Sequence, residues 1–264
     1  MNRRQFMLST AIATIAAGSA RAAGAGIEAT FMIEGESGAV IRRDGPCAQR
    51  FTPCSTFKIP LALMGFDAGI LQDPLHPAIP YDPALKASAR ERRTVDPTVW
   101  LSESIIWYSR HVTAGLGAER FRRYVEGFDY GNRDVTGTKG RGDGLTHSWL
   151  MSSLRLSAEE QVGFLERMLK GQLPVSAGAV EKTMAACPVF AAGDWTVHGK
   201  TGSGWHDEMP GTTNRDRPLG WFIGWAEKGG RRILFARVEV RSGPAGDPGG
   251  PRARARLLAE LAAL

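Results

Sequence analysis

Cysteine is scarce in this chain, and beyond the N-terminus no apolar run approaches the length that spans a bilayer. The 264 residues include three cysteines, and no two of them have the C-x-x-C spacing of common zinc and redox sites. The five histidines form no H-E-x-x-H or similar ligand pattern. We therefore expect no metal site and no membrane anchor in the mature protein.

A strong charge of one sign is also missing. The formal net charge is +6, but residues 1–22 contribute three arginines and no acid, so 30 basic and 27 acidic residues remain. The arginines are scattered rather than gathered along one stripe, which argues against a nucleic-acid partner. Hydrophobic residues make up 43% of the chain, enough for a buried core.

The N-terminus reads MNRRQFMLSTAIATIAAGSARAAG: a basic start, a short apolar run and an A-x-A-like site. This pattern predicts a signal peptide over residues 1–22, followed by one domain over 23–264. Arg3-Arg4 resembles the twin-arginine signal, so we expect recognition by export machinery and delivery to a bacterial periplasm. In that oxidising compartment Cys47 and Cys54 could pair and leave Cys187 over, or all three could remain buried thiols.

Strand-like runs occur near both ends of the chain, and helical patterns lie between them. Residues 27–44 indicate a hairpin, and the Gly229-Gly230 pair indicates a second one. Residues 157–171 predict a helix with a capping box, and 252–264 an amphipathic helix. We expect an α+β fold in which N- and C-terminal strands share one central antiparallel sheet, flanked by helices, with a mainly helical lobe beside it.

The stretch CSTFKIP, residues 54–60, places Ser55 and Lys58 three positions apart, on one face of a helix. Because proline is tolerated only in the first turn, Pro60 predicts a helix that begins near Ser55 or Thr56. A serine needs a base to become a nucleophile, and a lysine can be that base only if burial removes its proton. Cys54 lies i−4 from Lys58, so spacing alone leaves a thiol nucleophile open.

Four further motifs follow in order. They are SII at 104–106, YGN at 130–132, WL at 149–150 and KTG at 200–202. Together with STFK at 55–58, they resemble the class D β-lactamases, or oxacillinases, from about residue 28 to the C-terminus. The element S-D-N of other serine β-lactamases is absent. Ile106 stands where valine is more usual, which puts the rate and CO2 affinity of the base in question, but not the fold.

The resemblance implies hydrolysis of the β-lactam amide through an acyl-enzyme on Ser55, which leaves Cys54 no catalytic role. Lys58, carboxylated by CO2, would be the general base, and no separate cofactor is implied. The resemblance places this carbamate in an apolar pocket, with Trp149 donating to it from Nε1; the pocket residues are Phe57, Ile106, Trp149 and Leu150.

Ser104 would relay a proton to the departing nitrogen. Lys200, Thr201 and Gly202 would bind the substrate carboxylate, and the backbone N–H groups of Ser55 and Ser203 would form the oxyanion hole. Of the C-terminal arginines 252, 254 and 256, helical phase favours Arg254 as a second carboxylate ligand.

Three alternatives share some of these features. A penicillin-binding carboxypeptidase has S-x-x-K and K-T-G but deacylates slowly, and it lacks the residues of the carbamate pocket. A β-lactam sensor domain is acylated and stops there, but it usually follows a membrane anchor. An interaction protein on an inactive scaffold would not need five intact motifs.

Overall fold

The computed structural model describes residues 26–206, 214–243, 246 and 248–264. The predicted signal peptide lies outside these residues. Within the described ranges, no helix has both the length and the apolar character needed to cross a membrane.

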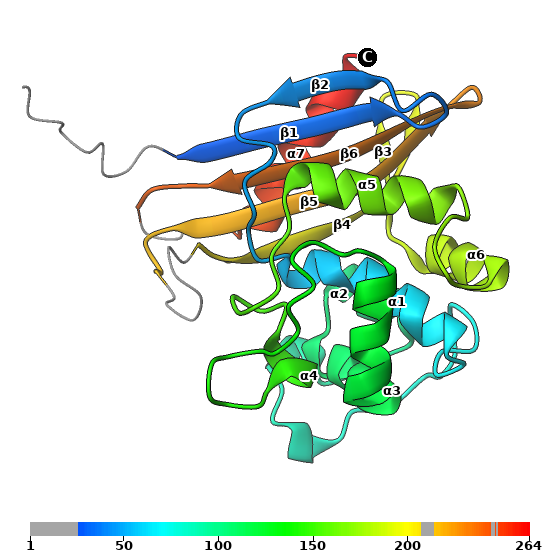
Figure 1. Cartoon of the computed structure of the whole chain (residues 1–264), viewed down its shortest axis with the longest axis vertical. Helices are drawn as coiled ribbons and strands as arrows, with labels where there is room; N and C mark the ends of the chain where they lie inside the picture. Colours follow the sequence, from blue (N-terminus) through cyan, green and yellow to red (C-terminus); the bar gives the residue numbers. More distant parts are fainter. Residues whose placement is uncertain (1–25, 207–213, 244–245, 247) are drawn as a thin grey trace, which may run out of the picture.

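One six-stranded antiparallel sheet is formed by strands from the two ends of the chain, as predicted (Figure 1). Its order is β2-β1-β6-β5-β4-β3, so the N-terminal strand pairs with the last one. The strands are β1 (Ile27–Glu34), β2 (Val40–Asp44), β3 (Val189–Ala192), β4 (Trp195–Trp205), β5 (Pro218–Lys228) and β6 (Arg231–Val240).

Most of the helices lie between β2 and β3 in the chain, and a last one follows β6. The α-helices are α1 (Lys58–Asp67), α2 (Pro97–Glu103), α3 (Ile106–Gly127), α4 (Gly144–His147), α5 (Ala158–Leu169), α6 (Ala177–Ala186) and α7 (Gly249–Ala262). Three short 3-10 turns are η1 (Cys54–Phe57), η2 (Pro83–Leu85) and η3 (Ala89–Glu91). Helices α1 to α4 form the predicted lobe beside the sheet (Figure 1).

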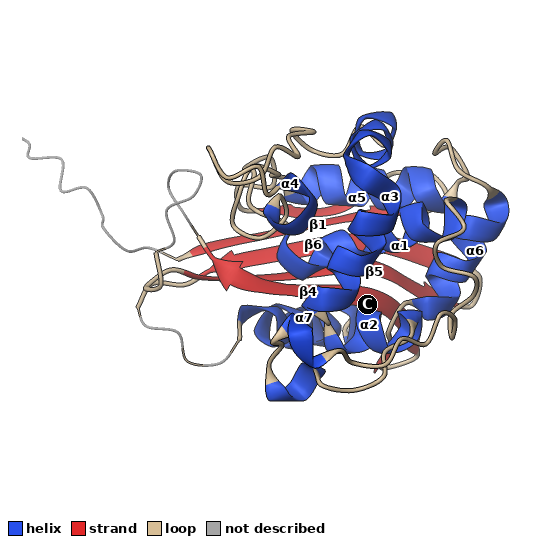
Figure 2. Cartoon of the chain, turned by 90° about the horizontal axis from the view of Figure 1, so that it is seen from below, coloured by secondary structure: helices blue, strands red, loops and turns tan. Residues whose placement is uncertain are grey.

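Both faces of the sheet are covered. Helix α7 packs against β3 to β6 on one face, and α5 packs against β1, β5 and β6 on the other (Figure 2). Residues 218–226 of β5 are therefore buried without interruption, because a central strand with two covered faces has no polar side. Phe222 faces α7, whereas Trp221 and Ile223 belong to the core cluster shared with the helical lobe.

Local sequence signals account for several element ends. Gly229 and Gly230 have φ values of 57° and 83° and make the turn of the β5–β6 hairpin. Ser157 and Glu160 form the predicted capping box at the start of α5.

The helix predicted from Ser55 begins later than expected. Residues 54–57 form the 3-10 turn η1, and α1 starts at Lys58, with Pro60 in its first turn. Cys54 at the head of this turn has φ 51°, which a continuous α-helix cannot accommodate. Ser55 therefore lies in a tight turn leading into the helix.

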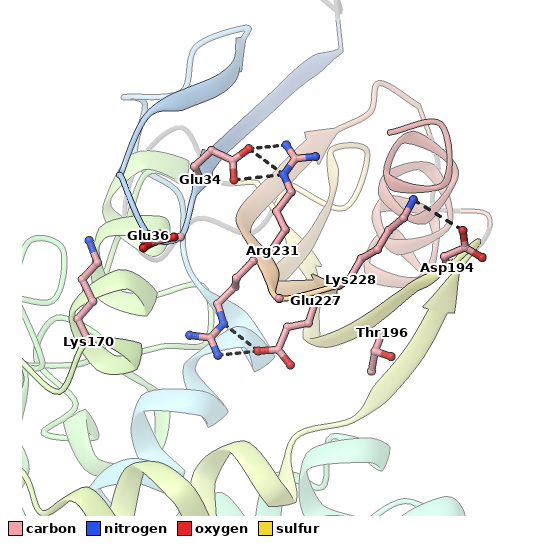
Figure 3. Close-up of a pocket in the computed structure, with 12 residues that line it drawn as sticks. Glu34, Glu36, Lys170, Asp194, Thr196, Glu227, Lys228 and Arg231 are labelled. Carbon is pink, nitrogen blue, oxygen red and sulfur yellow. Dashed lines mark hydrogen bonds and ion pairs between the residues drawn. The ribbon is translucent and has the colours of Figure 1, made fainter.

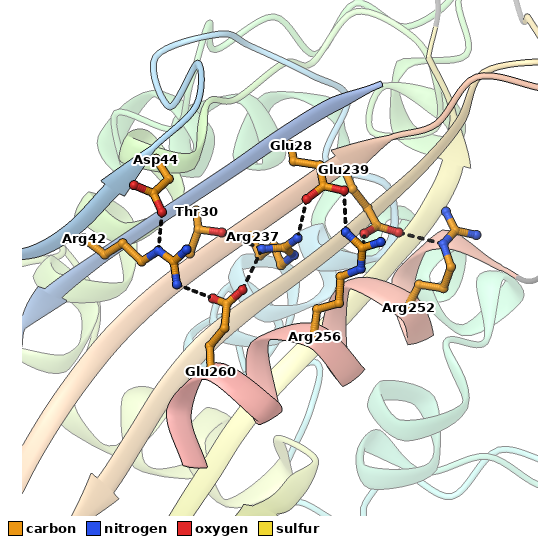
Figure 4. A network of polar contacts seen from close by, with 9 residues as sticks. All are labelled: Glu28, Thr30, Arg42, Asp44, Arg237, Glu239, Arg252, Arg256 and Glu260. Atoms are coloured by element: carbon orange, nitrogen blue, oxygen red, sulfur yellow. Dashed lines mark hydrogen bonds and ion pairs between the residues drawn. The ribbon is translucent and has the colours of Figure 1, made fainter. Parts of the chain in front are cut away.

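Helix α7 is attached to the sheet by a network of charged side chains (Figure 4). Glu239 is 1% exposed and accepts a 2.8 Å bond from Arg252 Nε in the first turn of α7. Arg237, 4% exposed, donates to Glu28 and to Glu260. Because Glu239 and Arg237 are buried, the free-energy cost of removing their charges from water must be offset by their oppositely charged partners.

Replacing Glu239 with alanine should therefore lower the free energy of unfolding by about 3 kcal/mol, because Arg252 loses its buried ion-pair partner. Urea unfolding followed by circular dichroism measures this. Glu119→Ala is the control: its pair with Arg123 is exposed, so the change should stay below about 0.5 kcal/mol. A loss under about 1 kcal/mol for Glu239→Ala would contradict this account.

Candidate active site

Ser55 and Lys58 meet at the start of α1. Every residue from 51 to 60 is buried except Ser55, which is half-buried. The Lys58 Nζ lies 3.4 Å from Ser55 Oγ and donates to it. Lys58 is 1% exposed, and burial lowers its pKa well below the usual 10.5, with the charge of Lys200 lowering it further. Burial thus favours the neutral form of an amine that lies beside an accessible hydroxyl, the arrangement that a serine nucleophile requires.

Ser104 and Lys200 form a second pair. Ser104 ends α2 in the left-handed conformation, with φ 58° and ψ 37°. Lys200 Nζ donates to Ser104 Oγ at 2.5 Å and to Thr201 O at 3.0 Å. Lys200 is 1% exposed, and burial lowers its pKa to about 7. At neutral pH this amine is therefore divided between its charged and neutral forms.

The N–H groups of Thr201 and Ser203 point to an open edge of β4. Gly199 N donates to Pro188 O on the β3 side, and strand N–H directions alternate, so Thr201 and Ser203 N–H share that side. Pairing with β3 ends at His198, so among the described residues no strand pairs with this part of the edge. Backbone donors at such an edge can bind a developing oxyanion.

Gly202 places this edge against the Ser55 turn. A Cβ at Gly202 would lie 2.8 Å from Pro53 O and 3.3 Å from Thr56 N, distances that only glycine allows. The K-T-G strand and the nucleophile turn are therefore in direct contact.

The three C-terminal arginines differ in their partners. Arg252 is bound to Glu239, and Arg256 to Glu28. Arg254 has no carboxylate partner among the described residues, and its guanidinium lies 4.7 Å from the centre of the Phe190 ring. Its charge helps to lower the pKa of Lys200, so it lies within electrostatic range of that amine. The geometry favours Arg254 as the arginine available to a ligand.

The expected apolar pocket is largely aromatic. Phe57 and Trp149 are both buried, and their rings stack at 5.4 Å. Within the described part of the chain, the Trp149 indole N–H has no protein acceptor. Leu150 is half-buried against the same core. Ile106 is also half-buried, whereas its neighbour Ile105 is the isoleucine that belongs to the buried core.

Tyr130 of the Y-G-N motif supports the Ser55 turn from behind, whereas Asn132 bonds to the backbone of Ser153 and Arg155. Tyr130 donates to Gln161 Oε1 at 3.0 Å, Gln161 donates to Thr56 Oγ1 at 3.0 Å, and Thr56 donates to Pro53 O at 2.7 Å. This buried chain of hydrogen bonds ends on the backbone of the Ser55 turn.

Two charged residues beside the site, Arg90 and Glu91, were not predicted. Both influence the pKa of Lys58, yet they come from the loop between α1 and α2. The only signal in the sequence is the charged run 90–93, which is typical of a solvated surface.

A cleft of about 850 Å³ lies at the other end of the sheet, around the β5–β6 hairpin (Figure 3). Its opposite charges pair with one another: Arg231 with Glu34, Arg232 with Glu227 and Lys228 with Asp194. Its described residues therefore offer no concentrated charge of one sign. Among the described residues, no group of three or more His, Cys, Asp and Glu side chains could hold a metal ion.

All three cysteines lie in the described residues, and none forms a disulfide. The pairing of Cys47 with Cys54 is therefore wrong, and the alternative of three buried thiols holds. Cys47 donates to two carbonyl groups, those of Thr30 and Asp44, on the β1–β2 side. Cys54 instead faces Met151, with the two sulfurs 4.0 Å apart, so the two thiols have different neighbours.

Known proteins resemble this chain along most of its length. Residues 25–261 match the penicillin binding protein transpeptidase domain. Beta-lactamase OXA-9 of Klebsiella pneumoniae is 46% identical over 241 residues, 90% of this chain and 88% of the relative. Beta-lactamase OXA-1 of Escherichia coli is 37% identical over 72% of this chain and 66% of its own length. The crystal structure of the OXA-427 class D beta-lactamase superposes with a TM-score of 0.83 at 40% identity, covering 89% of this chain and 96% of that one.

The buried thiols should resist alkylation in the native protein. Burial raises the pKa of Cys187 to about 12, so at pH 8 this thiol stays protonated and does not react with iodoacetamide. Mass spectrometry should find Cys187 unlabelled in the native protein and all three cysteines labelled in guanidinium. A peptide linked by a Cys47–Cys54 disulfide, or rapid native labelling of Cys187, would contradict the structure.

Proposed function

Since the chain belongs to the class D β-lactamases, we propose that it hydrolyses the amide bond of β-lactam antibiotics through an acyl-enzyme on Ser55, and so confers resistance to them. The observation that carries this proposal is the buried Lys58 amine, 3.4 Å from the half-buried Ser55 hydroxyl. A penicillin-binding carboxypeptidase or a sensor domain would share the acylation step but not rapid turnover.

Lys58 fits the carboxylated lysine that the family resemblance implies. Only a neutral amine takes up CO2, and burial holds the pKa of Lys58 low. Phe57 directly precedes Lys58 in the chain, and its ring stacks on that of Trp149. The indole N–H of Trp149 has no protein acceptor in the described part of the chain. Carboxylation would supply an anionic oxygen base within reach of Ser55 Oγ.

The remaining residues bind and orient the substrate. We assign the oxyanion hole to the N–H groups of Ser55 and Ser203, because the open edge of β4 adjoins the Ser55 turn. Lys200, Thr201 and Arg254 supply donors and positive charge for the substrate carboxylate.

Ser104 lies where a proton can be relayed. Its hydroxyl accepts from Lys200 Nζ at 2.5 Å, so a proton leaving Ser104 for the departing nitrogen can be replaced from Lys200.

The location of the protein remains a proposal based on its N-terminus. Residues 1–22 resemble a twin-arginine signal peptide, which would deliver the enzyme to the periplasm. There it would meet β-lactams before they reach their targets.

Lys58→Ala should lower kcat for a penicillin by about 1,000-fold, because Ser55 loses its general base. Added bicarbonate should raise the wild-type rate and leave the variant unchanged. A panel of penicillin, oxacillin and a carbapenem, followed by absorbance with and without bicarbonate, measures both effects. Lys170→Ala, which removes a lysine paired with Glu166 on α5, should behave as wild type. A stable acyl adduct without turnover in the wild type would support the sensor instead.

The pH dependence of kcat/KM should follow the ionisation of the Lys200 amine. Because burial lowers the pKa of Lys200 to about 7, its charge is present below pH 7 and lost above it. The kcat/KM of the wild type for an anionic β-lactam should therefore fall as pH rises through about 7. Lys200→Arg keeps its charge, so its profile should stay flat on the alkaline side, whatever its absolute rate. Lys228→Arg, at the far hairpin, is the control and should keep the wild-type pH profile. If kcat/KM of Lys200→Arg falls above pH 7 as it does in the wild type, the assignment to Lys200 is contradicted.

A further inference from the structure

Glu91 is a buried carboxylate close to the active site. It ends the turn η3 and is 7% exposed. No lysine, arginine or histidine of the described residues forms a salt bridge with it. A buried acid without an ionic partner depends on hydrogen bonds to remain charged, so its contacts indicate what it does.

These contacts lead to the first residues of α3. Glu91 Oε1 accepts from Ile106 N at 2.9 Å, and Oε2 accepts from Ser88 Oγ at 3.1 Å. The backbone oxygen of Glu91 accepts from Trp107 Nε1 at 3.0 Å. One residue thus holds both the backbone and a side chain of the first turn of α3.

The start of α3 needs such a partner. The first N–H groups of a helix have no acceptor within the helix, and a polar N-cap side chain usually supplies one. Here the N-cap residue is Ile105, which has no side-chain acceptor and whose side chain is buried in the core. Glu91 therefore caps α3 from a separate loop, and its negative charge suits the positive end of the helix.

Ser104 lies directly before this capped end. It terminates α2, and only Ile105 separates it from the first residue of α3. Its left-handed conformation is unfavourable for a residue with a side chain, so the surroundings must impose it. Ser104 is thus held between the end of α2 and Ile106, whose N–H is bound to Glu91. In this position its hydroxyl lies 2.5 Å from Lys200 Nζ.

We propose that Glu91 is a positioning residue, which fixes the Ser104 hydroxyl for proton transfer by accepting the Ile106 N–H. This inference rests on the proposed function, because it assigns Glu91 to the acylation step in which Ser104 acts. Its charge is secondary, since glutamine at this position offers the same acceptor to Ile106 and can donate to Ser88.

Glu91→Ala and Glu91→Gln separate the hydrogen bond from the charge. Stopped-flow measurement with a chromogenic cephalosporin should show acylation slowed about 100-fold in Glu91→Ala, because a misplaced catalytic group costs about that much. Glu91→Gln should retain acylation within about threefold of wild type. Deacylation should change little in either variant, since Ser104 protonates only the departing nitrogen. Glu119→Gln, which changes an exposed carboxylate further along α3, is the matched control and should acylate as wild type.

Ile106→Pro tests the same bond from the donor side. Proline has no N–H but is favoured at the first position of a helix, and the extended conformation of Ile105 suits a following proline. Ile106→Pro should slow acylation as Glu91→Ala does, and the double variant should be no slower than either single one. If Glu91→Ala does not fold, Ile106→Pro decides the question through its two rates: slowed acylation with unchanged deacylation supports the proposal, whereas equal slowing of both steps would indicate damage to the Lys58 pocket and overturn it.

Acylation by Glu91→Ala within twofold of wild type would overturn the proposal, as would equal losses in Glu91→Ala and Glu91→Gln. Additive losses in the double variant would also overturn it. The wild type keeps the two proposals apart: if it shows no turnover or no bicarbonate response, the Lys58 mechanism fails whatever Glu91 does.

Discussion

The burial of one lysine amine is the constraint on which the rest of this structure depends. Lys58 is almost completely removed from water, and no carboxylate of the described residues forms an ion pair with it, so the charged form is strongly disfavoured. The surrounding fold keeps water out, because the residues on both sides of Lys58 in the chain are buried and Phe57 stacks on the buried Trp149. The same wall leaves Ser55 as the accessible residue of the turn. Stability and reactivity therefore come from the same packing.

Three segments distant in the chain supply the site: the Ser55 turn, the Ser104 link and β4. The Ser55 turn receives the edge of β4 at Gly202, where a side chain would collide with Pro53. Ser104 occupies the short link between α2 and α3. Cys54 and Ser104 both adopt left-handed conformations, each costing about 1–2 kcal/mol. Such conformations persist because rigid helices and strands on either side allow the linking residues no alternative.

The charges around the site are mainly positive. Lys200, Arg254 and Arg90 all lie within electrostatic range of the reacting groups, whereas the nearby buried acid Glu91 is occupied with the start of α3. This balance suits an anionic ligand. The larger charged network beneath α7 serves a different purpose, because it anchors the helix that carries Arg254 on the sheet.

Hydrophobic patterns and turn residues in the sequence were sufficient to determine the α+β class, the shared sheet and the two hairpins, because these depend on local periodicity and glycine. The ordered motifs were sufficient to identify the family and to single out Ser55, Lys58, Ser104 and Lys200. Only the tertiary structure decided that Ser55 lies in a 3-10 turn, that Cys47 and Cys54 remain apart and that Arg252 and Arg256 are already occupied. It also revealed Glu91, whose charged neighbours in the sequence suggest an exposed surface. The physical reason is the same in each case: periodicity reports which face of an element is buried, but the partner of a particular side chain is set by contacts between segments that only folding brings together.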